Sequence, residues 1–85
     1  MPWFVYILRD AAGRHYIGMT SDLDRRIAQH RSGGTQTTRR MQGSLSLAAA
    51  ASFATRSDAL LIEHKLKNWK NPHKAIAYLS SASSG

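Results

Sequence analysis

The 85-residue sequence contains no cysteine, only two prolines and only five acidic residues, one of which is glutamate. The lack of cysteine excludes disulfides and zinc sites built on thiolates, and it permits a reducing compartment. No apolar run approaches the roughly 20 residues that a membrane-spanning helix needs. Met1-Pro2-Trp3 leads straight into a predicted strand instead of a signal peptide. We therefore expect one small cytoplasmic domain with no membrane partner.

Most of the charged residues in the sequence are basic. Twelve lysines and arginines give a formal net charge of +7 and a pI near 10.6. Each phosphate that a cationic side chain neutralises releases a counterion, so this excess favours a polyanionic partner. We expect a nucleic acid, DNA in preference to RNA, bound by a monomer or a weak dimer. The alternative is a basic protein whose charge serves only solubility.

The first twenty residues predict a β-hairpin. Trp3–Leu8 and Arg14–Met19 are rich in β-branched and aromatic residues, as strands are. Between them, Asp10-Ala11-Ala12-Gly13 has aspartate where a turn begins and glycine where the chain needs a positive φ. The sequence therefore predicts a tight turn joining two antiparallel strands.

The length of this turn decides where two tyrosines lie. A three-residue loop places Tyr6 opposite Gly18 and puts Tyr6 and Tyr16 on one face as diagonal neighbours. Gly18 would then leave an open space in front of Tyr6, suited to a ligand. A two-residue loop shifts the register by one residue and separates the tyrosines. The functional interpretation therefore depends on the turn.

Capping residues and helical spacing predict three helices. A Ser-x-x-Asp pattern opens the first and a Gly-Gly pair ends it, Thr-x-x-Asp opens the second, and Asn-Pro opens the third. The last six residues are small and polar, which is typical of a frayed end. The predicted helices run from Ser21 to Ser32, from Thr55 to Trp69 and from Asn71 to Leu79.

The segment Leu45–Phe53 is ambiguous because its four consecutive alanines favour a helix. Leu45, Leu47 and Phe53 nevertheless fall on odd positions, and we predict a third strand. The expected fold is α+β: a three-stranded antiparallel sheet, made of the hairpin and this strand, flanked by three helices. We expect one domain over residues 1–79 and a flexible tail over 80–85.

Several polar side chains are predicted to face inward without serving the core. They comprise two phenols, a guanidinium, an imidazole and one carboxylate, which are groups that can cut a phosphodiester. A single carboxylate suits one Mg²⁺ ion that keeps most of its waters. Each residue also has an ordinary structural role open to it, in a strand or in an ion pair along a helix. The set is Tyr6, Tyr16, Arg26, His30 and Glu63.

The sequence resembles the GIY-YIG nuclease superfamily. It is most similar to the small stand-alone bacterial endonuclease-like group and less similar to the nuclease domain of the excision-repair protein UvrC. The first motif reads Val-Tyr-Ile-Leu, without the Gly-Ile-Tyr order that names the superfamily. The matching blocks span nearly the whole chain, in family order, and are Val5–Leu8, Tyr16–Thr20, Asp22–His30 and Ala59–Lys67.

The resemblance implies a role for each of the five residues. It makes Tyr6 or Tyr16 the general base, places Arg26 near the scissile phosphate and His30 in the proton network, and assigns Glu63 to a single Mg²⁺ or Mn²⁺ ion. It thereby implies a metal-dependent endonuclease that hydrolyses DNA phosphodiester bonds in DNA repair or recombination. The alternative is a nucleic-acid-binding module with the same fold and little or no cleavage.

Further polar residues are candidates for contacts with the nucleic acid. A Thr-Thr-Arg-Arg run combines hydroxyls with cations, as phosphate contacts do. A flexible surface linker would have the same composition. Where many relatives carry Tyr-Thr-Arg, this chain has Thr37-Thr38-Arg39 and so lacks the aromatic ring. The candidate nucleic-acid-binding residues are Arg25, Thr38, Arg39, Arg40, Lys67 and Lys70.

Overall fold

The protein folds into a three-stranded antiparallel sheet with helices on both faces, as the sequence predicts. The computed structural model describes residues 2–32 and 45–83. No helix in these two segments is long and apolar enough to cross a membrane. The elements are β1 (Trp3–Arg9), β2 (His15–Thr20), α1 (Leu23–Arg31), β3 (Ser46–Phe53), α3 (Arg56–Trp69) and α4 (Pro72–Ser83).

The hairpin turn has the predicted three-residue loop. The Asp10 backbone amide donates to the Arg14 carbonyl at 3.0 Å, and Gly13 takes a φ of 85°. The Asp10 carboxylate accepts from the backbone amides of Ala12 and Arg14 at 3.0 and 2.7 Å. These hydrogen bonds hold the loop at three residues, and they fix the register of β1 against β2.

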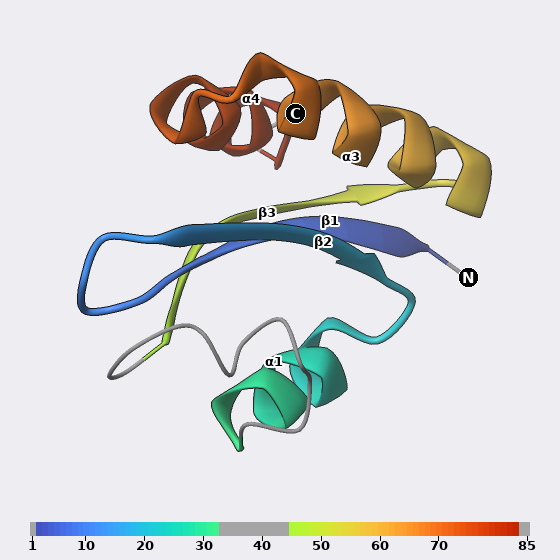
Figure 1. Cartoon of the computed structure of the whole chain (residues 1–85). Coiled ribbons are helices and arrows are strands. Elements are labelled where there is room, and N and C mark those ends of the chain that lie inside the picture. Colours follow the sequence, from blue (N-terminus) through green and yellow to red (C-terminus); the bar gives the residue numbers. More distant parts are fainter. Residues whose placement is uncertain (1, 33–44, 84–85) are drawn as a thin grey trace.

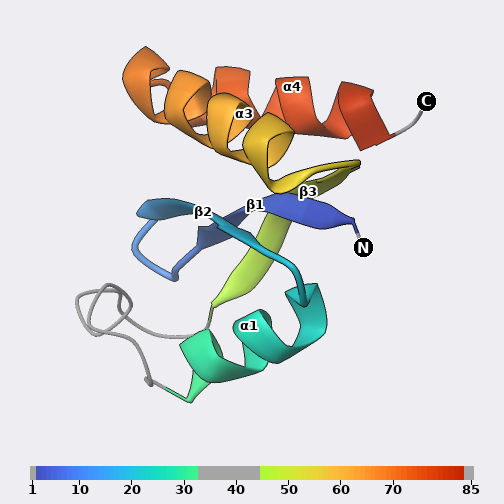
Figure 2. The ribbon, with the colours of Figure 1, turned by 90° about the vertical axis from the view of Figure 1, so that its right-hand side faces the viewer.

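The sheet separates a layer that holds the apolar core from a layer that holds polar groups. Helices α3 and α4 cover one face, and α1 lies on the other (Figures 1 and 2). β1 is central, with β2 on one side and β3 on the other. Val5 and Ile7 of β1 point to the α3–α4 side, where they pack with Ala59, Leu66 and Leu79, all at most 1% exposed. The apolar core therefore lies in that layer, leaving the α1 face for polar groups.

The alanine-rich segment is a strand, as predicted, but its side chains do not alternate throughout. Ile7 pairs with Ala49 whereas Leu8 pairs with Leu47, so one extra residue bulges out of β3. A bulge reverses the facing of the residues beyond it. The expectation that all odd positions share one face is therefore wrong at Leu47, which is 41% exposed and borders α1 instead of the core.

The predicted caps of the two C-terminal helices are confirmed. Thr55 accepts the Asp58 amide at 3.1 Å, and the Asn71 side chain accepts the Lys74 amide at 3.1 Å. The first helix is capped by Asp22, which accepts the Arg25 amide, and not by Ser21 as predicted. Thr20 Oγ1 accepts the Asp22 backbone amide at 3.1 Å, so Ser21 lies in the bend before the helix and Asp22 takes the cap position.

The predicted C-terminal end of the last helix is wrong, and the predicted glycine stop of the first helix is not described by the structure. α4 continues through Ser83, so the tail expected to begin at residue 80 is helical for its first four residues. The helix simply has no proline or glycine in this stretch to end it. α1 ends at Arg31 with Ser32 as its C-cap, and the predicted Gly33-Gly34 stop lies outside the described residues.

Candidate active site

Two phenols share the sheet face that lies toward α1. Tyr6 pairs with Gly18 and Leu8 with Tyr16, the register that the three-residue loop predicts. The rings of Tyr6 and Tyr16 are diagonal neighbours with centroids 6.2 Å apart. The prediction that the tyrosines lie on one face is therefore confirmed.

Gly18 has a different role from the predicted one. A β-carbon built on Gly18 would lie 2.6 Å from the Tyr6 hydroxyl oxygen, 2.7 Å from Tyr6 Cζ and 3.0 Å from Tyr16 Cε2. The space in front of Tyr6 is therefore filled by the two tyrosine rings, and the expected ligand seat is not there. Glycine is needed at this position so that the Tyr6 side chain can lie across the neighbouring strand.

His30 joins the two tyrosines from α1. Its Nε2 is 2.8 Å from the Tyr6 hydroxyl, and its ring centroid lies 5.8 Å from Tyr6 and 5.1 Å from Tyr16. His30 is 2% exposed and is the buried residue of α1. The interaction that docks the described part of α1 on the sheet is thus largely polar and aromatic.

Arg26 lies one helical turn before His30, on the same side of α1. Its side chain is half-buried, and it borders a small hollow of about 190 Å³ with Thr20 and Arg25. Asp22, the alternative partner for Arg26, uses its carboxylate to cap the helix at the Arg25 amide. Arg26 therefore presents a fixed positive charge beside the phenol–imidazole pair.

Burial and neighbouring charges shift the proton affinity of this pair. Burial raises the pKa of Tyr6 above that of an ordinary phenol, and Tyr16 and Glu63 raise it further while the Arg26 charge opposes them. Burial also lowers the pKa of His30, and the Arg26 charge lowers it again. Near neutral pH, both groups are therefore held uncharged.

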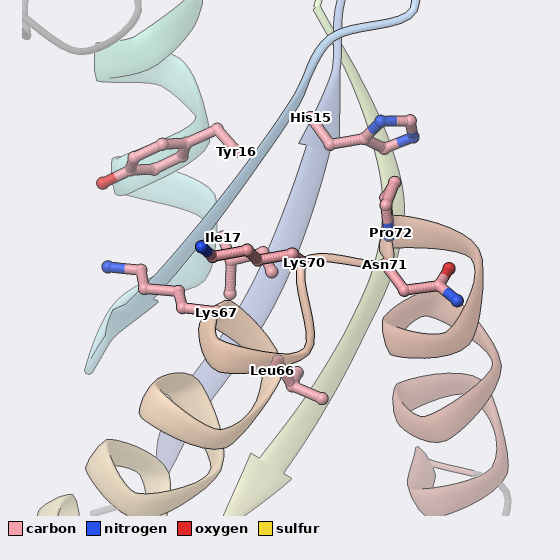
Figure 3. A pocket seen from close by; sticks show the side chains of 8 residues that line it. All are labelled: His15, Tyr16, Ile17, Leu66, Lys67, Lys70, Asn71 and Pro72. Atoms are coloured by element: carbon pink, nitrogen blue, oxygen red, sulfur yellow. The ribbon is translucent and has the colours of Figure 1, made fainter.

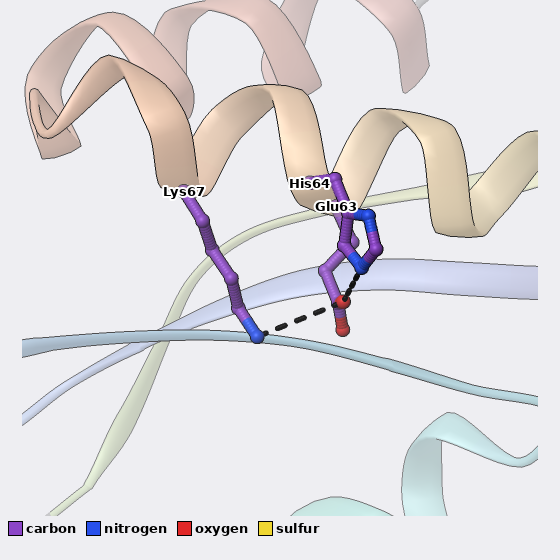
Figure 4. Close-up of polar contacts among 3 residues, drawn as sticks. All are labelled: Glu63, His64 and Lys67. Carbon is purple, nitrogen blue, oxygen red and sulfur yellow. Dashed lines mark ion pairs between the residues drawn. The ribbon is translucent and has the colours of Figure 1, made fainter.

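Glu63 reaches the site from α3, on the opposite side of the sheet. It is 8% exposed, and its Oε1 lies 3.6 Å from Lys67 Nζ and 3.8 Å from His64 Nε2. Figure 4 shows Glu63 and Lys67 extending from α3 toward the strands and ending at the level of the sheet. Glu63 is close enough to Tyr6 for its charge to contribute to the raised pKa of that phenol.

Of the five predicted residues, the structure brings Tyr6, Tyr16 and His30 into contact. Arg26 and Glu63 are linked to them through their charges, which lower and raise the pKa of Tyr6, respectively. The ion pair with Lys67, weighed as the structural alternative for Glu63, is present as well. A buried carboxylate held by one exposed lysine remains able to bind a competing cation, so the two roles are compatible.

The predicted nucleic-acid-binding residues fall into three groups. Arg25 is exposed on α1, while Lys67 and Lys70 are exposed at the end of α3. The two lysines border a pocket of about 440 Å³ between the edge of β2 and the α3–α4 turn (Figure 3). Thr38, Arg39 and Arg40 lie outside the described residues.

Sequence reasoning missed this pocket, and His15 on its wall is not among the predicted site residues. The pocket forms where the turn between α3 and α4 meets β2, so its walls come from two segments distant in sequence, 15–17 and 66–72. The Lys70-Asn71-Pro72 turn was the available signal, because a left-handed residue followed by a capped helix forces the chain to bend there.

The fold and the tyrosine–histidine cluster, with its nearby arginine and buried glutamate, define a nuclease-type catalytic domain. The model of the GIY-YIG catalytic domain family matches residues 2–76, and the chain belongs to this family. Membership implies nuclease-type chemistry on a nucleic-acid substrate.

Relatives match over most of the chain. The UPF0213 protein YhbQ of Escherichia coli O139:H28 is 38% identical over 81 residues, which is 95% of this chain and 81% of that protein. The YhbQ protein of Shigella boydii serotype 18 is 42% identical over 78% of this chain and 66% of that protein. The solution NMR structure of the UPF0213 protein BH0048 from Bacillus halodurans superposes with a TM-score of 0.58 and 32% identity, covering 98% of this chain and 87% of that one.

Proposed function

We propose that the protein is a metal-dependent endonuclease that hydrolyses DNA phosphodiester bonds, with a role in DNA repair or recombination. The observation that supports the proposal is the buried Tyr6–His30 hydrogen bond, on which Tyr16, Arg26 and Glu63 all act. Such a set combines a proton acceptor, an anion-stabilising cation and a cation-binding carboxylate, which are the parts phosphoryl chemistry requires.

The donor set fits one hard divalent cation. Among residues 2–32 and 45–83, no group of three or more histidine, cysteine, aspartate or glutamate side chains could hold a metal. Mg²⁺ commonly retains several waters and accepts one or two protein carboxylates together with substrate phosphate. Glu63 alone would thus hold Mg²⁺ or Mn²⁺. Such an ion, when bound, stabilises negative charge on the phosphate and makes a bound water more acidic.

The two phenols are suited to different tasks. Tyr6 is 1% exposed and has a raised pKa, so it stays protonated and serves to position its neighbours. Tyr16 is only half-buried, and its hydroxyl points away from β2 on the side of α1 (Figure 3). We assign the general base to Tyr16 because the attacking water can reach it, with the neutral His30 ring holding it in place.

Arg26 is assigned to the scissile phosphate. Its positive charge acts on both neutral groups, because it lowers the pKa of His30 and opposes the raised pKa of Tyr6. The guanidinium would bind the phosphate oxygens through paired hydrogen bonds and stabilise the additional charge of the transition state.

One observation favours the second candidate, a nucleic-acid-binding module with little or no cleavage. Glu63 is already paired with Lys67, so a metal ion must compete with that ammonium group for the carboxylate. If that competition fails, the domain binds nucleic acid through its positive charge alone.

The two candidates are separated by incubating the protein with supercoiled plasmid and Mg²⁺ or Mn²⁺. We expect nicking by the wild type, and a loss of about a hundredfold or more in Glu63→Gln and Tyr16→Phe. Asp58→Asn is the matched control, since it removes one exposed carboxylate from the first turn of the same helix. A salt-dependent gel shift by the wild type without any nicking would overturn the enzyme proposal in favour of the binding module.

A further inference from the structure

We propose that the pocket at the edge of β2 binds the nucleotide next to the phosphodiester that is cut, with Lys67 and Lys70 holding its phosphate. This inference rests on the proposed function, since it names a substrate subsite beside the same cluster. The link is Tyr16, which lines the pocket and also contacts His30 and Tyr6.

The orientation of the side chains joins the pocket to the cluster. In Figure 3 the ammonium groups of Lys67 and Lys70 and the hydroxyl of Tyr16 point in the same direction, toward the side of β2 where α1 lies. A phosphate held by the two lysines therefore lies on the same side of the edge strand as the phenol assigned to the reaction. A nucleic-acid strand contacting both places follows the edge of β2.

The composition of the pocket selects a nucleotide over a bare anion. The apolar residues Ile17, Leu66 and Pro72 line it, with Leu66 only 1% exposed and therefore contributing little surface, and the imidazole of His15 adds a flat ring. Its volume of about 440 Å³ lies in the range of small-molecule sites. A flat apolar body with an anionic group matches this surface, and base stacking on rings is a usual mode of nucleic-acid binding. A free phosphate would use only the two lysines.

Lys70 occupies a backbone conformation that lysine rarely adopts. It ends α3 in the left-handed region, with φ 52° and ψ 32°, where glycine or asparagine is less strained. The turn places its side chain on the rim of the pocket. A charged ligand at that rim accounts for a lysine at a position where local backbone preference favours another residue.

Lys67 connects the pocket with the acid. Its Nζ lies 3.6 Å from Glu63 Oε1, and half of its side chain is exposed. An ammonium group on such a flexible stem can exchange the carboxylate for a phosphate without any movement of the backbone. Occupation of the pocket would thus leave Glu63 with one fewer competing cation.

The test measures binding without cleavage. A short fluorescein-labelled DNA oligonucleotide is titrated in EDTA at several salt concentrations against the wild type, Lys67→Gln, Lys70→Asn and the control Lys65→Gln. The control removes the same charge from α3, but Lys65 packs over Trp69 and Tyr78 and does not line the pocket. Lys70→Asn suits the left-handed turn, and an unchanged or raised Tm separates lost contact from lost stability.

We expect each pocket variant to weaken binding about threefold to tenfold and to reduce the salt slope by about 0.7. In amide NMR, a 5′-phosphorylated dinucleotide should shift Ile17, Leu66 and Lys70, whereas inorganic phosphate should shift only the lysines. Equal weakening by Lys65→Gln, or dinucleotide shifts confined to α1, would overturn the pocket proposal. Because no metal is present, these results are independent of plasmid nicking, which alone decides the enzyme proposal.

Discussion

Replacing Gly18 with alanine tests whether the two tyrosine rings are packed as tightly as the structure indicates. The new methyl carbon would lie 2.6 and 2.7 Å from Oη and Cζ of Tyr6 and 3.0 Å from Cε2 of Tyr16. Contacts this short require a neighbour to move. Tyr6 is 1% exposed and its hydroxyl is 2.8 Å from His30 Nε2, so the ring has no solvent to move into.

The expected loss of stability is the sum of three contributions to the free energy of unfolding. Overpacking a well-packed site costs about 1–3 kcal/mol, and a displaced Tyr6 loses a hydrogen bond of about 1 kcal/mol. Against these, alanine restricts the unfolded chain and returns about 0.4–1 kcal/mol. The Gly18→Ala variant should therefore be about 1–3 kcal/mol less stable. In a domain of this size, each kcal/mol lowers Tm by about 4–8 °C.

The assay is thermal and urea unfolding followed by circular dichroism, carried out in a double-mutant cycle with Tyr6→Phe. Removing the hydroxyl deletes the atom nearest the new methyl group, so the cost of Gly18→Ala should fall by about 0.5 kcal/mol or more in the phenylalanine background. An unchanged Tm for Gly18→Ala would refute the reasoning. Strict additivity in the cycle would place the strain at a contact other than the Tyr6 hydroxyl.

Three further predictions test the remaining features. The lowered pKa of His30 means that the unfolded chain takes up a proton below about pH 6.5 before the folded protein does. The free energy of unfolding should therefore fall as the pH drops below that value. If urea unfolding gives a His30→Gln variant the same dependence of this free energy on pH as the wild type, the prediction is wrong. Thr55→Ala removes the cap on the Asp58 amide and should cost about 1 kcal/mol by the same urea titration, with no effect meaning that the cap adds nothing. Lys67→Met removes the ion pair with Glu63 and should therefore tighten Mn²⁺ binding, measured by calorimetry. Equal Mn²⁺ affinities of the variant and the wild type would disprove this expectation.

Local features of this fold are predictable because few residues decide them. The turn length follows from Asp10 and Gly13, and it alone fixes the register that puts both tyrosines on one face. The caps at Thr55 and Asn71 are equally local, since each side chain bonds an amide three residues ahead. The strand over the alanines was predicted from apolar residues at odd positions, a pattern that holds at Phe53 but that the bulge breaks at Leu47.

The features that sequence reasoning missed depend on contacts between distant segments. The bulge at Ile7 and Leu8 is a property of how β3 pairs with β1, and nothing within residues 46–53 marks it. The space beside Gly18 was correctly located but wrongly called open, since its filling depends on the rotamer of a tyrosine on the next strand. The pocket at the β2 edge has walls from two segments distant in sequence, so no single motif encodes it.

The narrowness of the sheet allows the proposed site to include residues from both of its faces. Tyr6, Tyr16 and His30 lie on the α1 side, whereas Glu63 belongs to a helix on the other side. In a wide sheet, an acid on the far face would be screened from the phenols by intervening strands. Here β2 is an edge strand on which α3 packs, and the charge of Glu63 helps to raise the pKa of Tyr6 from that side. Among residues 2–32 and 45–83 no strand pairs with the outer side of β2, and a strand added there would cover the pocket that Lys67 and Lys70 border, so the proposed site requires an open edge at β2.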